Sequence, residues 1–208
     1  MVKPSIRSFR NIIFDLGGVI LNLSVPATLQ AFASKSQKTV EQISAHLSAP
    51  EFLAYEKGQI SDSDFRAAVR GRLGTSLTDQ DIDNCWNAML GDLPMAGINL
   101  LTSLRKTHQT FLLSNTNAIH LSRFASIVRY ANIDNFDALF TRAYYSHLIG
   151  MRKPDTEIFQ HVLQQNNLRA NETVFLDDNE VNLRGAASVG IHTIHIENPA
   201  MTVALFHE

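Results

Sequence analysis

Acidic and polar side chains directly follow three short apolar runs of the chain. Asp15 follows the run NIIF, and Ser114 with Asn115 follows TFLL. The acid pair Asp177 and Asp178 follows TVFL. Continuous apolar runs are typical of buried strands in a parallel sheet, and ligands bind at the carboxyl ends of such strands. We therefore expect these side chains to meet in one crevice.

Residues of these types, brought together, could transfer a phosphoryl group. An aspartate such as Asp15 can attack phosphorus and form an aspartyl-phosphate. Mg²⁺ would offset the repulsion between that carboxylate and an anionic substrate, and it binds through a few carboxylates and substrate phosphate oxygens. The hydroxyl of Ser114 and the ammonium of Lys153, which lies in the segment GMRKPD, could stabilise the charge on the transferred group.

Each of these residues also has an ordinary structural explanation. An aspartate at a strand end commonly caps a turn, Ser-Asn can itself form a turn, and a lone lysine can be a surface charge. The adjacent acids Asp177 and Asp178 are harder to explain in this way, because they repel each other unless a cation or hydrogen bonds compensate. The ordered combination, more than any single residue, indicates a catalytic site.

The elements that must position this site alternate along the second half of the chain. Five apolar runs have the length and flanks of strands, at residues 11–16, 110–115, 138–142, 173–178 and 192–196. Helical periodicity separates the later runs, over 155–165 with Pro154 at its start and over 179–190 with Gly190 at its end. This alternation predicts an α/β fold with a Rossmann-like, doubly wound parallel sheet as its core.

A long stretch after the first run carries helix signals and no convincing strand. Ser61 and Thr78 each precede an aspartate by three residues, which is a near relative of the capping box, and apolar side chains around them follow helical spacing. We predict a small inserted helical cap over residues 25–95. The α/β core would then comprise residues 1–24 and 96–208.

The composition is that of an ordinary globular protein. The chain has 208 residues, of which 45% are hydrophobic and 18% charged, and its formal net charge is −2. Nothing in this charge indicates a nucleic-acid partner, and the early apolar run is too short to span a bilayer. The single cysteine, Cys85, excludes an intramolecular disulfide. We expect a cytoplasmic protein with no nucleic-acid or membrane partner, and the sequence leaves its oligomeric state open.

Four segments of the chain resemble the four ordered motifs of haloacid dehalogenase (HAD) superfamily hydrolases. They are FDLGGV (14–19), LLSNTN (112–117), GMRKPD (150–155) and FLDDN (175–179). The predicted insert resembles the cap of those members that have an α-helical cap. Together with YEKGQIS at 55–61, the motifs are most similar to a bacterial group that includes an α-D-glucose-1-phosphate phosphatase. The resemblance implies a phosphoric monoester hydrolase.

The resemblance also implies a role for each matching residue. Asp15 would be the nucleophile, with Lys153 and Asp177 completing the catalytic set. Mg²⁺ would be bound by Asp15, Asp178 and the backbone carbonyl of Gly17. The phosphate of the substrate would be held by a further set, namely Gly18, Ser114, Asn115 and Lys153.

The first motif departs from the family pattern at Gly17. Most phosphatases of the superfamily carry a second aspartate there, whose acid–base assistance is typically worth about 10²–10⁴-fold. Either the leaving group needs little protonation, or another group such as Asp177 or a water takes over, or the protein is a catalytically weak relative that binds a phosphorylated ligand. A further family acid, four residues after Asp178, is replaced by Asn182, for which we expect only a supporting role.

The expected function is Mg²⁺-dependent hydrolysis of a small phosphorylated metabolite through an aspartyl-phosphate. Sugar phosphates such as glucose 1-phosphate are favoured over nucleotides and flavin phosphates. The alternative enzyme is a metal-independent 2-haloacid dehalogenase, which is disfavoured because the acid pair suits Mg²⁺ and those dehalogenases typically have an aromatic residue at position 17. Tyr55 and Glu56 of the insert are interpreted as structural, with substrate contact as the alternative. The sequence does not decide whether Asn117 and Arg152 touch the substrate.

Overall fold

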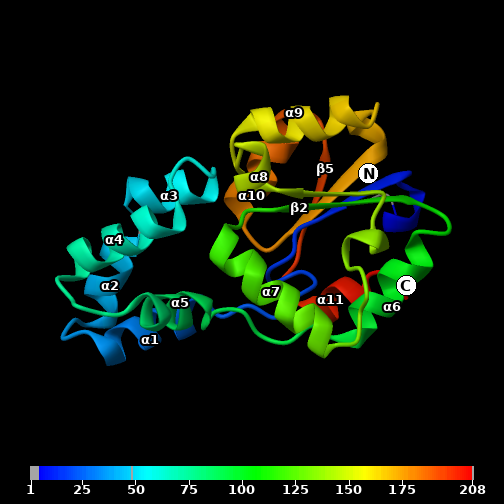
Figure 1. Ribbon diagram of the computed structural model, residues 1–208. Helices are drawn as coiled ribbons and strands as arrows, with labels where there is room; N and C mark the ends of the chain where they lie inside the picture. Colours follow the sequence, from blue (N-terminus) through cyan, green and yellow to red (C-terminus); the bar gives the residue numbers. More distant parts are fainter. Residues whose placement is uncertain (1–4, 48, 208) are drawn as a thin grey trace.

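A five-stranded parallel sheet forms the centre of the molecule (Figure 1). The computed structural model describes residues 5–47 and 49–207. The strands are β1 (Asn11–Phe14), β2 (Gln109–Ser114), β3 (Arg142–Tyr145), β4 (Thr173–Asp177) and β5 (His192–His195). They lie in the order β3-β2-β1-β4-β5, and every neighbouring pair is parallel. The predicted α/β fold with a parallel core is confirmed.

Helices cover both faces of the sheet. One layer contains α6 (Met95–Leu104), α7 (Ala118–Tyr130) and α11 (Pro199–Ala204), and the other contains α8 (Ser146–Ile149), α9 (Thr156–Gln165) and α10 (Glu180–Ser188). Short 3-10 helices lie at Ile6–Ser8, Asp137–Leu139 and Ala170–Glu172. Among the described residues, no helix combines the length and the apolar character needed to cross a membrane.

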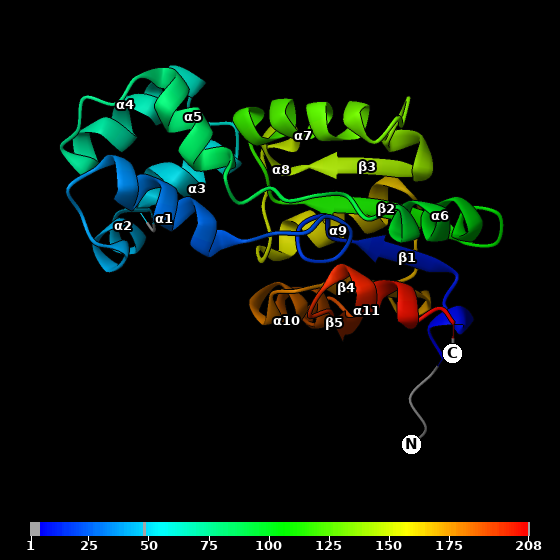
Figure 2. The same ribbon diagram turned by 90° about the horizontal axis from the view of Figure 1, so that it is seen from below.

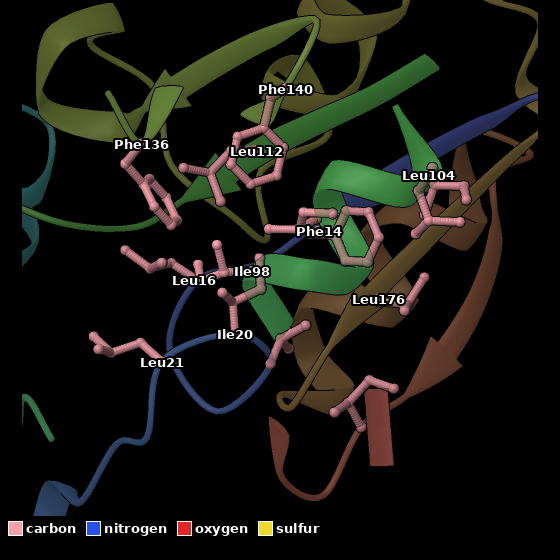
Figure 3. Packing of buried hydrophobic residues seen from close by; sticks show 14 of the residues in the cluster. Phe14, Leu16, Ile20, Leu21, Ile98, Leu104, Leu112, Phe136, Phe140 and Leu176 are labelled. Carbon is pink, nitrogen blue, oxygen red and sulfur yellow. The ribbon is translucent and has the colours of Figure 1, made fainter. Parts of the chain in front are cut away.

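Alternate residues of each strand serve the two helical layers. On β1, Ile12 and Phe14 belong to the hydrophobic cluster on the α6 side, whereas Ile13 belongs to the cluster on the α9 side. Figure 3 shows Phe14 packed close to Phe140 and Ile98 in the first of these clusters. Because both faces are covered, the strands have continuous apolar sequences in place of an alternating pattern.

Five further helices form a separate bundle, called the cap below, beyond the carboxyl ends of the strands (Figure 2). They are α1 (Val25–Lys35), α2 (Val40–Leu47), α3 (Pro50–Glu56), α4 (Asp62–Leu73) and α5 (Asp79–Asn87). They enclose a hydrophobic cluster of their own, which includes Phe32, Phe65 and Trp86. Ser61 and Thr78 start α4 and α5 with complete capping boxes, as their spacing from the following aspartates predicts.

The two linkers that join the cap to the core run side by side. The main-chain amide of Asn22 donates to the carbonyl of Asp92 over 3.0 Å, and the amide of Gly91 donates back to Asn22 over 2.9 Å. Leu23 and Leu90 form an antiparallel bridge between them. The predicted insert extends to residue 95. In the structure, Met95 is the first residue of α6, which packs on the sheet.

Two details of the predicted elements are wrong. The third strand does not occupy 138–142, because Phe140 packs into the core against Phe14 and Phe136, and the strand begins only at Arg142. Pro154 does not start the helix that follows it, since Asp155 is the N-cap residue and the helix begins at Thr156. For the strand, packing of Phe140 decides a boundary that apolar content alone does not fix.

Candidate active site

A buried ion-pair cluster lies at the carboxyl ends of β1 and β4. The ammonium of Lys153 is 2.8 Å from Asp15 Oδ1 and 2.6 Å from Asp177 Oδ2. The side chains of Lys153 and Asp177 are 1% and 0% exposed, and that of Asp15 is 12% exposed. Only Asp15 of the three reaches the pocket surface, so Lys153 and Asp177 act on it from behind.

Asp177 is fully engaged by donors of the protein. Its Oδ1 accepts from the main-chain amide of Asn179 over 2.8 Å and from the side-chain amide of Asn182 over 3.1 Å. Its Oδ2 accepts from Lys153. The residue that we considered as a replacement acid therefore holds Lys153 in place, and Asn182 supports it.

The three acids of the motifs stand close enough together to share a cation. Oxygens of Asp15, Asp177 and Asp178 all lie within 4.8 Å of one another. Asp178 is exposed, and no lysine, arginine or histidine of the described residues forms an ion pair with it. Carboxylate oxygens in this number suit Mg²⁺, which retains several waters and substrate oxygens as its other ligands. The donor set thus fits the expected metal, with Asp15 and Asp178 as the more available ligands.

Burial and mutual repulsion shift the protonation of these groups. Burial raises the pKa of Asp15 to about 7, with Asp177 adding to the rise and Lys153 opposing it. Burial alone would lower the pKa of Lys153, but the carboxylates of Asp15 and Asp177 outweigh it and raise that pKa. Burial and the charge of Asp177 also raise the pKa of Asp178. A bound cation would offset this concentration of negative charge.

Asn115 fixes the loop that carries Lys153. Its side-chain amide donates to the carbonyl of Lys153 over 2.9 Å, and its carbonyl accepts from the amide of Lys153 over 2.9 Å. This two-way contact occupies the side chain that we expected to hold phosphate, although Asn115 also lines the pocket. Ser114, at the end of β2, is 3% exposed and lines the pocket as expected.

Gly18 allows Asp178 to approach the first motif. Its φ is +71°, and a Cβ built on it would lie 2.5 Å from Oδ2 of Asp178. Its amide donates to the carbonyl of Leu21, so this N–H is not available to a substrate phosphate, and Gly18 does not line the pocket. The structure therefore places Gly18 as the residue that makes room for the carboxylate of Asp178.

Gly18→Ala should lower the free energy of unfolding by about 1–3 kcal/mol, because alanine would adopt a strained positive φ and displace Asp178. Urea denaturation checks this value. Gly71→Ala is the matched control: Gly71 lies in α4, and no atom lies within 4 Å of the place that a Cβ would take, so this change should stabilise by about 0.5–1 kcal/mol. Equal effects of the two substitutions would contradict the role given to Gly18.

Leu23 fills the space beside Gly17. A Cβ at position 17 would lie 2.9 Å from Leu23 Cδ2, and Leu23 is about one-third exposed at 36%. The side chain of an acid at this position would therefore meet the end of a leucine from the linker. Position 17 has no acidic side chain, and the end of Leu23 lies where such a side chain would begin.

A pocket of about 520 Å³ opens above Asp15, between the core and the cap. Its core residues include Ser114, Asn115 and Asp178. The cap and linkers contribute a set that the motifs do not include: Leu23, Val25, Glu56, Trp86, Met89 and Leu90. Arg152 and His120 also line it. The sequence raised Glu56 and Arg152 as possible substrate contacts, whereas the apolar lining residues come from segments with no chemical signature of their own.

His120 joins the core to the cap through a buried network. Its Nε2 is 3.0 Å from the carbonyl of Trp86, and its ring stacks on the Trp86 ring with centroids 4.9 Å apart. Nε2 therefore carries the proton, and Nδ1 accepts from the side-chain amide of Asn117 over 3.1 Å. Burial lowers the pKa of His120 to about 4. The neutral ring is the form that holds this junction together.

The folded protein should lose about 2 kcal/mol of stability through His120 between pH 7.5 and pH 5. The unfolded histidine has a pKa of 6.5 and the folded one about 4, so the unfolded state binds more protons within this window. Stability is retained above pH 6.5 and is lost as the pH falls toward 4. Urea denaturation of the wild type and of His120→Gln at several pH values isolates the effect. Parallel pH profiles for the two proteins would contradict it.

A parallel sheet with a lysine-bridged acid cluster at its carboxyl edge and a pocket above it is the arrangement of an α/β enzyme. Its family follows from comparison with known sequences. The chain belongs to the haloacid dehalogenase-like hydrolases, whose sequence profile matches residues 9–190. This confirms the family resemblance of the four motifs and the assignment of the chain as a hydrolase.

Relatives of known structure or activity align with nearly the whole chain. D-ribitol-5-phosphate phosphatase of Bacteroides thetaiotaomicron is 27% identical over 92% of this chain and 93% of its own length. The crystal structure of a HAD family enzyme from the same organism, a magnesium complex, is 31% identical, covers 97% of this chain and 100% of its own, and has a TM-score of 0.87. A wild-type structure of a HAD family enzyme from that organism, with magnesium and inorganic phosphate, is 33% identical over 90% and 93% of the two chains, with a TM-score of 0.77.

Proposed function

We propose that the protein is a Mg²⁺-dependent phosphatase that hydrolyses a small phosphorylated metabolite through an aspartyl-phosphate on Asp15. The observation that carries this proposal is the acid cluster beneath the pocket. Lys153 pairs with Asp15 and Asp177, while Asp178 lies exposed beside them. The similarity to a D-ribitol-5-phosphate phosphatase and to magnesium-containing structures supports the same chemistry.

Several residues of the chain have separate roles in the proposed reaction. Asp15 attacks phosphorus with its carboxylate, the bond from phosphorus to the leaving oxygen breaks, and that oxygen takes a proton from water. A further water then hydrolyses the aspartyl-phosphate, which releases inorganic phosphate and regenerates the Asp15 carboxylate. Lys153 keeps Asp15 oriented, and Asp177 keeps Lys153 charged and in position. Mg²⁺, held by Asp15, Asp178 and the Gly17 carbonyl, would supply charge neutralisation for the phosphate oxygens. Ser114 would donate its hydroxyl proton to one of those oxygens.

The substrate class follows from the lining of the pocket and from the relatives. A sugar or polyol phosphate is favoured, with glucose 1-phosphate and ribitol 5-phosphate as the first compounds to examine. Residues 25–95 would act as the cap that excludes water and selects the leaving group, and 1–24 with 96–208 would carry the chemistry. We place this activity in the cytoplasm.

The test is phosphate release from a panel of sugar phosphates, polyol phosphates, nucleotides and acyl phosphates, with Mg²⁺ and with EDTA. Turnover that requires Mg²⁺ is expected. Chloride release from 2-chloropropionate that is unaffected by EDTA would instead establish the dehalogenase alternative. Binding of phosphorylated ligands by folded protein, with no turnover of any compound, would establish a catalytically weak relative.

Gly17→Asp combined with Leu23→Ala should raise hydrolysis of a simple alkyl phosphate by about 10-fold or more, because a carboxyl group can then protonate the leaving oxygen. The second change makes room for the new side chain, because a Cβ at position 17 would lie 2.9 Å from the end of the Leu23 side chain. Acetyl phosphate, whose leaving group needs little protonation, should gain much less. Leu23→Ala alone is the control. An unchanged or lower rate for the alkyl ester in the folded double variant would show that acid assistance is not what position 17 lacks.

A further inference from the structure

One ion pair between the cap and the core lies inside the pocket. Arg152 Nε donates to Glu56 Oε2 over 2.8 Å, and the two side chains are 20% and 27% exposed. Both residues line the pocket. Arg152 directly precedes Lys153, and Glu56 is the last residue of α3, so the pair joins the loop of the catalytic lysine to the cap.

The pair has unused hydrogen-bonding groups. Within the described parts of the chain, only Nε of the guanidinium and only Oε2 of the carboxylate have a protein partner. The two Nη groups of Arg152 remain as donors, and Oε1 of Glu56 remains as an acceptor. A hydroxyl group both donates and accepts, so a pair of neighbouring hydroxyls could satisfy both side chains at once.

On another side of the pocket, the lining is apolar. Figure 1 shows α3 meeting the core near α8, whereas α5 and the linkers meet it near α7. The apolar lining residues Leu23, Val25, Trp86 and Met89 come from this second side. A carbon chain that carries hydroxyls could pack against them and direct its hydroxyls to Glu56 and Arg152.

We infer that Glu56 and Arg152 are specificity-determining residues that bind hydroxyl groups of a polyhydroxylated leaving group. This inference rests on the proposed phosphatase function and specifies its substrate class. The pair is neutral overall and Glu180 lies nearby in the pocket, which disfavours a second anionic group on the substrate. A purely apolar leaving group would bury the unused donors and acceptor without partners, which is costly.

The chain supplies a matched control for a merely structural role. Lys57 Nζ is 2.8 Å from Asp155 Oδ2, so a second ion pair joins the same helix end to the same loop. Neither Lys57 nor Asp155 lines the pocket. If the ion pairs at this junction only hold the cap against the core, removing the charge of Lys57 or of Arg152 should change the substrate preference equally.

The experiment compares two five-carbon esters, D-ribitol 5-phosphate and pentyl phosphate, in the full-length protein with Mg²⁺. The kcat/KM for D-ribitol 5-phosphate, divided by that for pentyl phosphate, should fall by about 10- to 100-fold in Arg152→Met and in Glu56→Gln, since each variant loses charge-assisted hydrogen bonds to hydroxyls. Lys57→Met should keep the wild-type ratio. An equal fall in Lys57→Met, or an unchanged ratio in Arg152→Met and Glu56→Gln, would overturn the inference.

A binding measurement separates this inference from the phosphatase proposal. In the Asp15→Asn background, calorimetry gives the affinity for ribitol 5-phosphate relative to inorganic phosphate. Adding Arg152→Met should lower that ratio, even if the wild type hydrolyses nothing and the phosphatase proposal fails. A ratio that Arg152→Met leaves unchanged would overturn the inference, whether or not turnover is observed.

Discussion

Asp15→Asn should abolish phosphate release, with kcat on the best substrate of the panel reduced at least ~10⁴-fold. The amide has the shape of the carboxylate but no anionic oxygen to attack phosphorus. Its oxygen can still accept from Lys153, which lies 2.8 Å from Oδ1 in the wild type, so the fold should persist. Phosphate release at saturating Mg²⁺ and substrate, followed over hours, measures the loss.

The control for this substitution is a second aspartate changed in the same way. Asp134 is exposed and does not line the pocket, so Asp134→Asn should retain wild-type turnover. Circular dichroism spectra should match for all three proteins. A folded Asp15→Asn that keeps more than a hundredth of wild-type activity would exclude Asp15 as the nucleophile and redirect attention to a water activated elsewhere in the pocket.

Lys153→Met should lower the free energy of unfolding by about 3–5 kcal/mol, besides removing activity. The reason is that the substitution leaves Asp15 and Asp177 buried without a counter-charge, and breaking one side of a buried ion pair has a cost of this size. The side chain of Asp177 is 0% exposed, so water does not solvate its charge. Guanidinium denaturation in EDTA at pH 7.5 isolates the effect from metal binding.

A double substitution distinguishes this electrostatic cause from the loss of packing. Asn at position 177 can still accept from Asn179 and carries no charge, so Lys153→Met with Asp177→Asn should be more stable than the sum of the two single changes predicts. Strict additivity would show that lost packing, not the unpaired acids, explains the destabilisation. Arg169→Met, which breaks an ion pair whose arginine is 78% exposed, should change stability little.

The sequence was most informative where chemistry and strand ends coincide. Asp15, Asp178 and Lys153 could be chosen because each belongs to a motif that follows a buried strand or starts the next helix, and the parallel topology then brings them together. The strand at Arg142–Tyr145 was misplaced because an apolar side chain packed over a sheet edge looks the same in sequence as one within a strand. Such boundaries depend on tertiary packing.

The contacts between residues of the pocket could not be predicted for a different reason. Glu56 and Arg152 are 96 positions apart and meet only because α3 docks on the loop before α9. The use of the Asn115 side chain to hold the Lys153 loop depends on the same long-range geometry. Neither residue type nor spacing encodes such contacts, so the motifs could not reveal which partners these side chains have in the folded chain.

Because the two linkers run side by side, the inserted helices join the core at a single place. The chain leaves the core at Asn22 and returns at Asp92, and these two points are held in direct hydrogen-bond contact. Any insert whose ends lie one strand spacing apart, about 5 Å, could close the same gap without altering the register of the sheet. Under the proposed function, exchange of this one contiguous segment would change leaving-group selection, while the acid cluster and its lysine stay unchanged beneath it.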